Sequence, residues 1–289
     1  MKENEKQSRI LEREKLIEEV KKLTLFDDVF MSAVLEDITA CQHVLRILTG
    51  ISDLSIRTVK SQYHITKLVS KRSRLDIFAE STDNQIYIIE VQKEDKGNHS
   101  KRVRYYRAMA DSELLRRGES YEKIPKCSLF YISETDIWNR GRTVYPIYKY
   151  LGNTGEEYED GQHIIFVNAE VDDYTEIAEL MKYFKTADPE DDSQGALSKR
   201  VKFLKGEKKG LDIMSNFGER MEKRGEERGE KRAERRLILG LLKAGVNNGE
   251  LVPSARSNCT TLPKQEYHLA GLLYRSATAL CQRCEPLFR

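Results

Sequence analysis

The sequence predicts an α/β fold with one core and charged helical extensions at both ends. Helix-like and strand-like patterns follow one another in the order helix, three strands, helix, strand. The 289 residues are enough to bury a full core. Charged residues make up 33% of the chain against 39% hydrophobic residues, so solvated helical segments are expected beside that core.

Residues 1–23 are expected to form a charged N-terminal helix. They lack the apolar stretch of a secretory signal, and no run of about 18 apolar residues occurs anywhere in the chain. We therefore expect a cytoplasmic protein without a membrane span. The five cysteines are odd in number and irregularly spaced, which predicts reduced thiols rather than a disulfide framework.

Residues 24–190 are expected to form the folded domain. Apolar side chains recur at helical spacing through residues 27–48, and Gly50 can end the last of one or two core helices. An antiparallel meander of three strands is predicted next, at 54–65, 72–80 and 85–92, with turn residues at 81–84. The remaining elements are a basic helix, a strand, two further strands of the same sheet and a helix, at 98–116, 126–133, 143–151, 163–167 and 174–184.

The second and third predicted strands carry a pair of acids. A hairpin that turns symmetrically about Asp83 places Asp76 opposite Glu90. Opposed side chains on one face of a sheet lie about 5 Å apart, and like charges there destabilise the strand pair unless something neutralises them. A divalent cation would neutralise this pair.

The composition of the third strand extends the expected metal site. Gln92 shares a face with Glu90 because strand side chains alternate, so Asp76, Glu90 and Gln92 are the candidate catalytic residues. Mg²⁺ prefers oxygen ligands, which the carboxylates of Asp76 and Glu90 and the carbonyl of Val91 can supply, and Mn²⁺ can substitute for it. Such a metal makes a bound water more acidic and neutralises charge that develops on a phosphodiester.

An alternative interpretation of the acid pair needs no metal. Two acids near a hairpin can also form a solvated strand end or pair with Arg72 and Arg74. The apolar run Ile86–Ile89 directly before Glu90 favours the metal site, because an unpaired carboxylate in such surroundings is costly to desolvate.

A basic segment follows the acid-bearing strand and is the candidate DNA contact. It has no acid between residues 96 and 107, and its expected DNA-binding residues are Lys96, Lys101, Arg102, Arg104, Tyr105 and Arg107. Cations beside tyrosine rings suit phosphate docking and base stacking, with strongly salt-dependent affinity. The alternative is that Tyr106 packs inward and the cations form an ordinary solvated helix face. His99 could shuttle protons, but a single histidine in a basic segment is usually exposed, and we leave it outside the catalytic set.

These residues together resemble the PD-(D/E)XK nuclease family transposases, relatives of the recombination-promoting nucleases. The resemblance covers roughly residues 24 to 240, and rests on the segments Asp28–Met31, Arg74–Ile77, Ile89–Gln92, Arg102–Tyr106, Tyr121–Pro125 and His163–Asn168. It implies a restriction-endonuclease-like αβββαβ core with a mixed sheet, and Mg²⁺-dependent cleavage of DNA with Asp76 and Glu90 as metal ligands.

The third motif position departs from the usual pattern of the superfamily. Gln92 stands where a lysine is usual, and an amide supplies neither positive charge nor a base, although the resemblance to this subfamily includes glutamine there. Lys93 is expected on the opposite strand face. Some members of the superfamily carry a further acid on the first core helix; Glu36 is the first candidate and Asp28 the second, and either could instead be solvated.

The C-terminal part of the chain is expected to lie outside the nuclease domain. Residues 191–245 read as a charged helical extension, in which residues 197–243 are a solvated arm or a weak coiled coil that could join copies into a homo-oligomer. Residues 246–289 lose this pattern, and we hypothesise a reading-frame change there. Cys281 and Cys284 have the spacing of half a zinc site, without a second pair after them.

Two functions remain open on the sequence. The first is a Mg²⁺-dependent DNA endonuclease that hydrolyses phosphodiester bonds and promotes recombination, or acts with a mobile element. The alternative is a catalytically inactive DNA-binding or self-assembling protein that keeps the nuclease fold. Gln92 and the altered tail keep the second function open.

Overall fold

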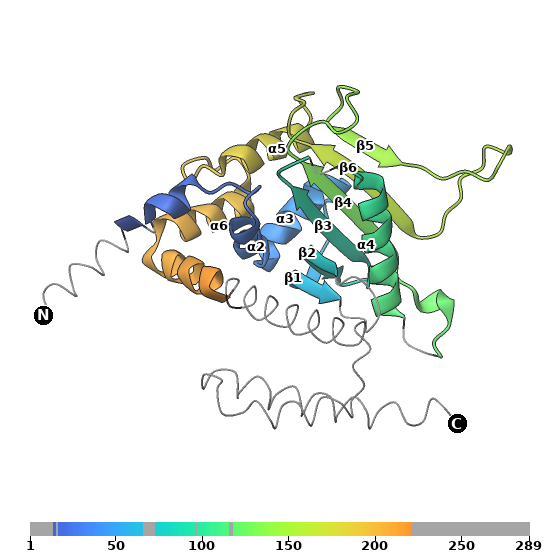
Figure 1. The fold of residues 1–289 in the computed structure, drawn as a ribbon, viewed down its shortest axis with the longest axis horizontal. Helices are drawn as coiled ribbons and strands as arrows, with labels where there is room; N and C mark the ends of the chain where they lie inside the picture. The colour runs from blue at the N-terminus through green and yellow to red at the C-terminus, as the bar shows by residue number, and fades with distance from the viewer. Residues whose placement is uncertain are drawn as a thin grey trace, which may run out of the picture. The chain divides into compact units, whose positions relative to one another are not determined.

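The fold is built on a six-stranded mixed sheet with helices on both faces, as a computed structural model describes it (Figure 1). The structure describes residues 14, 15, 17–65, 73–95, 97–115, 118–220 and 223. The strand order is β1-β2-β3-β4-β6-β5. The strands are β1 (Ile56–Ile65), β2 (Ser73–Ser81), β3 (Ile86–Gln92), β4 (Cys127–Ser133), β5 (Val144–Ile147) and β6 (Gln162–Asn168).

The sheet changes direction at β3. Strands β1, β2 and β3 pair antiparallel, which confirms the predicted meander, whereas β3, β4 and β6 pair parallel and β5 returns antiparallel along β6. A parallel connection needs a crossover, and the helix α4 (His99–Leu114) supplies it between β3 and β4. The mixed sheet that the family resemblance implied is therefore present.

The helices cover the two faces unequally. Helices α2 (Asp28–Leu35), α3 (Ile38–Thr49), α5 (Glu176–Thr186) and α6 (Gly195–Gly206) pack on one face and contribute to the larger apolar cluster. On the other face, α4 buries Val103, Met109 and Ala110 against side chains of β2, β3, β4 and β6. Figure 1 shows α4 on its own side of the sheet. A short 3-10 helix, η1 (Tyr121–Lys123), precedes β4.

Local capping explains where α3 begins and ends. The carboxylate of Asp37 accepts hydrogen bonds from the backbone N–H groups of Thr39 and Ala40, which have no partner within the helix. At the other end Gly50 adopts a left-handed conformation with φ 70°, as predicted for the residue that ends this helix.

The structure differs from the expected solvated arm over residues 195–217. Leu197, Val201 and Leu204 of α6 are fully buried, and apolar residues from 211–217 join the same cluster. The prediction from sequence followed the alternating charges of this segment and did not recognise the apolar side chains that face the core. The folded domain therefore extends past residue 190, and the remaining part of the predicted extension and the tail, residues 224–289, lie outside the described residues.

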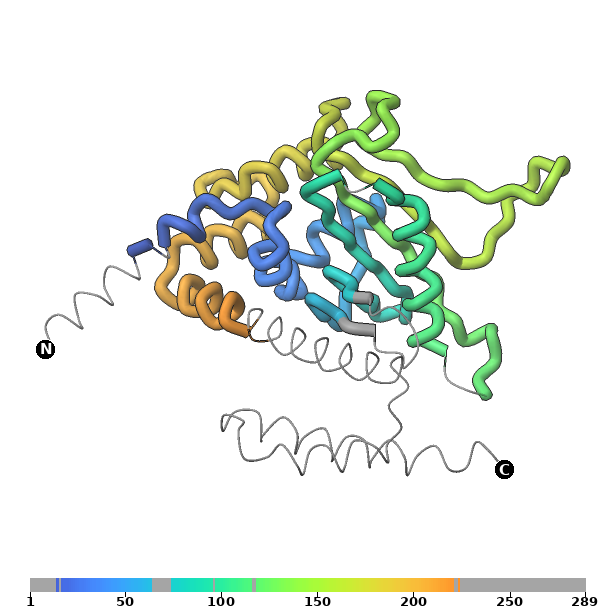
Figure 2. Tube along the Cα trace, viewed as in Figure 1, coloured from blue at the N-terminus to red at the C-terminus, as the bar shows by residue number. Residues whose placement is uncertain are grey.

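Lys205 ties this C-terminal part to the N-terminal part of the domain. Its buried ammonium donates to the carbonyls of Lys21, Leu23 and Ala187 at 3.1, 2.6 and 2.8 Å, and lies 5.0 Å from the ring centroid of Phe30. Figure 2 shows the orange segment returning to the blue one. Val20 is buried as well, so the core begins before the expected boundary at residue 24.

Two further observations concern the cysteines and the helices of the described part of the chain. Cys41 and Cys127 are free and buried. Within the described ranges, no helix combines the length and apolarity needed to cross a membrane. Cys259, Cys281 and Cys284 lie outside the described residues.

Candidate metal and nucleic-acid site

The acid pair lies where β2 and β3 stop pairing through their backbones. The paired register runs from Glu80–Ile86 to Ile77–Ile89, which is the register predicted from the turn at Asp83. The next position along each strand is Asp76 on β2 and Glu90 on β3. Both acids are buried, at 8% and 5% exposure, so the sequence pattern located a pair of desolvated carboxylates.

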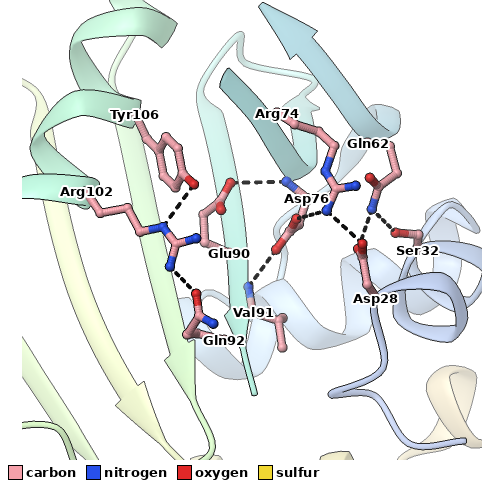
Figure 3. A network of polar contacts seen from close by, with 10 residues as sticks. All are labelled: Asp28, Ser32, Gln62, Arg74, Asp76, Glu90, Val91, Gln92, Arg102 and Tyr106. Carbon is pink, nitrogen blue, oxygen red and sulfur yellow. Dashed lines mark hydrogen bonds and ion pairs between the residues drawn. The ribbon is translucent and has the colours of Figure 1, made fainter. Parts of the chain in front are cut away.

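Each carboxylate replaces a missing backbone partner across the strands. The backbone N–H of Asp76 donates to Oε1 of Glu90 at 3.1 Å, and the backbone N–H of Val91 donates to Oδ2 of Asp76 at 2.9 Å. Figure 3 shows both contacts, one from each carboxylate to a backbone nitrogen of the other strand. These bonds orient one oxygen of each acid, and the second oxygen of Asp76, Oδ1, lies 3.8 Å from Arg74.

Burial dominates the proton affinity of both acids. The pKa of Asp76 is raised to about 6: burial is the largest cause, the hydrogen bond from Val91 opposes it, and the negative charge of Asp28 adds to the rise. Burial also raises the pKa of Glu90 well above its ordinary value, followed by the charge of Asp76. When the neighbouring buried carboxylates of Asp76 and Glu90 are both ionised, they need a positive partner.

The donor set fits a cation that retains much of its water. No group of three or more His, Cys, Asp or Glu side chains in the described ranges could enclose a metal ion. Mg²⁺ commonly takes only one or two protein carboxylates and completes its octahedron with water and phosphate oxygens. Asp76 and Glu90 supply the two carboxylates, and the carbonyl of Val91, on the same strand, is the third candidate oxygen.

Of the two candidate accessory acids, only Asp28 lies at this site. Its Oδ2 accepts a hydrogen bond from Arg74 at 2.7 Å, and its Oδ1 accepts one from Gln62 at 2.6 Å. Arg74 also lies 3.8 Å from Oδ1 of Asp76, so one guanidinium contacts both acids. Glu36 follows the last residue of α2, is exposed and does not line the cleft that contains the acid pair.

Gln92 lies on the α4 side of the site and holds an arginine. Its Oε1 accepts a hydrogen bond from Arg102 of α4. The same guanidinium donates through Nε to the hydroxyl of Tyr106 at 3.1 Å and is hydrogen-bonded to Tyr131 of β4. Tyr131 pairs with Glu90 in the parallel register, which brings its ring beside the acid pair. Figure 3 shows the two acids between Arg102 and Arg74.

The acid pair opens into a cleft of 810 Å³ between the sheet, α2 and α4. Its cationic and aromatic lining includes Arg74, Lys93, Lys101, Arg102, Tyr105 and Tyr106. Lys93 follows the last residue of β3 and pairs at 2.7 Å with Asp27, the residue before α2, whereas Gln92 contacts α4. The two side chains therefore point to opposite sides of the sheet, as expected, and Lys93 lines the cleft from the α2 side.

The basic residues of α4 divide into two groups. Lys101 is exposed and lines the cleft, and Arg104 is exposed outside it. Arg107 does not fit the expected DNA contact, because it is only 3% exposed and pairs with Asp111 at 3.2 Å inside the domain. Helical periodicity could have separated it, since Arg107 follows Val103 by one turn on the buried side. Lys96 lies outside the described residues.

His99 is not the exposed residue that the sequence suggested. Its Nδ1 lies 2.9 Å from the hydroxyl of Tyr131, and its Nε2 lies 2.8 Å from Oδ1 of Asp95. Because the carboxylate of Asp95 can only accept, Nε2 of His99 donates to it, and in the neutral ring Nδ1 then accepts from the Tyr131 hydroxyl. Sequence reasoning set His99 aside and did not single out Tyr131, because a lone histidine and a buried tyrosine carry no motif.

Comparison with known proteins places these features in a family. A family model described as PD-(D/E)XK nuclease family transposase matches residues 42–237. No curated protein and no solved structure matches the chain. The match covers the acid pair, Gln92, α4 and the buried helix α6, and it passes the boundary expected at residue 190.

Proposed function

Because the chain belongs to the PD-(D/E)XK nuclease family transposases, we propose that it is a Mg²⁺-dependent endonuclease that hydrolyses phosphodiester bonds of DNA. The observation that carries this proposal is the buried pair Asp76 and Glu90 in a cleft lined by cations. The breaks it makes would promote recombination or serve a mobile element. Mn²⁺ would substitute for Mg²⁺.

The proposed roles follow from what each side chain can donate or accept. Asp76, Glu90 and the Val91 carbonyl would hold the cation, with Asp28 as an accessory acid that fixes Arg74. A divalent cation bound there would supply Lewis-acid chemistry, since it polarises a phosphoryl oxygen and makes water more acidic. The protein holds the acids desolvated and in register, so little reorganisation is needed when substrate arrives.

DNA would be held by the cleft rather than read by base contacts. Lys101 and Arg102 line the cleft, and Arg104 extends the basic surface along the exposed side of α4. Tyr105 lies among these cations and can contribute a ring face to a base or sugar. Contacts of this kind bind phosphates without specifying sequence, so affinity should fall steeply with added salt.

One observation favours a second function. Gln92 is neutral and already hydrogen-bonded to Arg102, so it offers no base for activating water. A protein with this arrangement could bind DNA without cutting it. That alternative predicts DNA binding that needs no metal, together with intact plasmid under every metal condition.

Plasmid cleavage separates the two functions. Supercoiled plasmid is incubated with the full chain and Mg²⁺, Mn²⁺ or EDTA, alongside Asp76→Asn and Glu90→Gln. These amides keep a hydrogen-bond acceptor for the backbone N–H groups of Asp76 and Val91, whereas alanine would leave those groups without one. Asp83→Asn at the hairpin turn is the matched control. We expect cleavage by wild type and control in Mg²⁺ and in Mn²⁺ but not in EDTA; cleavage that persists in both site variants would exclude the proposed site.

A further inference from the structure

Arg102 is a cation held by neutral groups. Its partners are the amide of Gln92 and the hydroxyls of Tyr106 and Tyr131. Among the described residues, no carboxylate lies within ion-pair distance of its guanidinium. Arg74 on the opposite side of the acid pair differs, because Asp28 accepts from it at 2.7 Å and neutralises its charge. The charge of Arg102 is therefore oriented without being cancelled.

The guanidinium also keeps donors for a ligand. A guanidinium carries five N–H groups in a fixed planar fork, and three partners leave about two of them unused. The positive charge of Arg102 acts on both acids, because it lowers the pKa of Asp76 and of Glu90 against the effect of burial. Two donors beside a carboxylate pair form a geometry that a phosphate oxygen can satisfy.

We propose that Arg102 is a catalytic residue that binds the scissile phosphate, and that Gln92 is the positioning residue that aims it. The proposal rests on the proposed nuclease function. In the hydrolysis, a water oxygen forms the new bond to phosphorus, the bond from phosphorus to the leaving strand breaks, and the leaving oxygen receives the proton from water. Arg102 donates hydrogen bonds to the non-bridging oxygen whose negative charge grows, and it takes no proton.

The same geometry accounts for glutamine at position 92. A lysine there would place an ammonium against the guanidinium, whereas the amide oxygen of Gln92 accepts from it. A cation at position 92 and a cation at position 102 are thus alternative ways to put one positive charge beside Glu90. His99 and Asp95 support the second way, because they hold the hydroxyl of Tyr131 on the guanidinium.

Moving the positive charge from position 102 to position 92 tests the proposal by its effect on the cleavage rate. The variants are Arg102→Ala, Arg102→Lys, Gln92→Lys and the double variant Gln92→Lys/Arg102→Ala, with Arg57→Ala as the control. Arg57 pairs with Glu80 near the far end of the hairpin and does not line the cleft. Thermal unfolding is measured for each variant, and kcat and KM are compared among those that remain folded.

We expect Arg102→Ala to lower kcat about 10²–10³-fold, the usual effect of removing one transition-state donor, with little change in KM. Gln92→Lys should be impaired alone, and the double variant should recover at least about tenfold over Arg102→Ala. Arg102→Lys should retain part of the rate. An unchanged kcat in Arg102→Ala, or a double variant no faster than Arg102→Ala, overturns the proposal.

A binding experiment tests the contact without cleavage. DNA duplexes too short to bind in more than one register carry one neutral methylphosphonate at successive positions, and their affinity for wild type, Arg102→Ala and Arg57→Ala is measured in Ca²⁺. We expect one position to weaken binding to wild type and Arg57→Ala but not to Arg102→Ala. If no position shows this coupling, Arg102 does not contact phosphate. Wild type that shows the coupling but cuts no DNA would sink the nuclease function and leave the phosphate contact standing.

Discussion

The backbone N–H of Asp76 donates a hydrogen bond of 3.1 Å to Oε1 of Glu90, so the Glu90 side chain also links β3 to the backbone of β2. The same carboxylate therefore serves the proposed metal site and the structure of the sheet. A variant that removes the acid also removes a hydrogen-bond acceptor. Stability measurements on amide variants can separate the charge from the hydrogen bond.

The first prediction concerns stability and pH in the metal-free protein. The pKa of Asp76 is raised from 3.8 to about 6, so the folded state binds protons more tightly than the unfolded state. The free energy of unfolding should therefore fall as pH rises from about 4 to about 6, by up to about 3 kcal/mol at 1.4 kcal/mol per unit. Asp76→Asn should remove the part of this fall that comes from Asp76 and leave a part that comes from the raised pKa of Glu90, which urea denaturation across that range would measure.

Bound Mg²⁺ should offset the loss of stability that follows when the buried acids ionise. An ion that binds only the folded state stabilises it by about 2.7 kcal/mol at 100 times its dissociation constant. We expect Mg²⁺ in EDTA-treated protein to raise the Tm of wild type and of Asp83→Asn, and to leave Asp76→Asn and Glu90→Gln unchanged. An equal rise in all four proteins would indicate that the ion binds elsewhere.

Asp28 should act on Asp76 through charge. Its carboxylate raises the pKa of Asp76, and it also holds the guanidinium of Arg74. Asp28→Asn should therefore lower the pKa of Asp76 toward its ordinary value, because a negative charge is lost and Arg74 can turn to Asp76. Carboxyl-carbon NMR of the metal-free protein would follow the titration. Glu36→Gln, on the exposed end of α2, should leave that titration where it was.

Arg107 should contribute to stability and Lys101 to DNA binding, although both are basic residues of α4. Removing Arg107 leaves Asp111 partly buried without its ion-pair partner, so Arg107→Ala should cost about 2 kcal/mol or more of stability. Lys101→Ala should leave stability unchanged and reduce the slope of log affinity against log salt by about 0.9. The same slope in both variants would show that the basic helix does not meet DNA as proposed.

Lys205 should be required for folding although it does not line the cleft. Its ammonium donates to three backbone carbonyls, and Lys205→Met would leave them buried without donors. Unsatisfied buried groups each cost about 1–3 kcal/mol, so a loss of about 3 kcal/mol or more is expected. Chemical denaturation would measure it. Lys202→Met is the control, because within the described ranges Lys202 forms one ion pair, with Glu190 at the surface.

The site's strands were predictable because their signals are local. Turn residues at 81–84 set the register, and the register alone brought Asp76 to Glu90. Alternation then put Gln92 beside Glu90 without knowledge of any other strand. The parallel strand β4 contributed Tyr131, and nothing local in the sequence indicates which residue a parallel neighbour places opposite Glu90.

The basic helix and the C-terminal extension were less predictable for a shared reason. Arg107 and Lys205 are cations that lie inside the domain, where they find an acid or several carbonyls. Composition assigns such residues to the solvated surface, since unpaired charges are rarely buried. Their partners are supplied by tertiary contacts, some from residues more than 180 positions away.

The contact between Lys205 and the carbonyl of Leu23 also has a consequence for folding during synthesis, because the two residues are made at very different times. These two residues are 182 positions apart, and α6 together with residues 211–217 fills the face of the sheet that α2 and α3 begin. A ribosome-bound chain that ends before residue 217 has an open core. The acid pair, Gln92 and Arg102 are all translated by then, but their scaffold closes only after the last core helix has left the exit tunnel. The nascent chain is therefore expected to lack a formed nuclease site until that point.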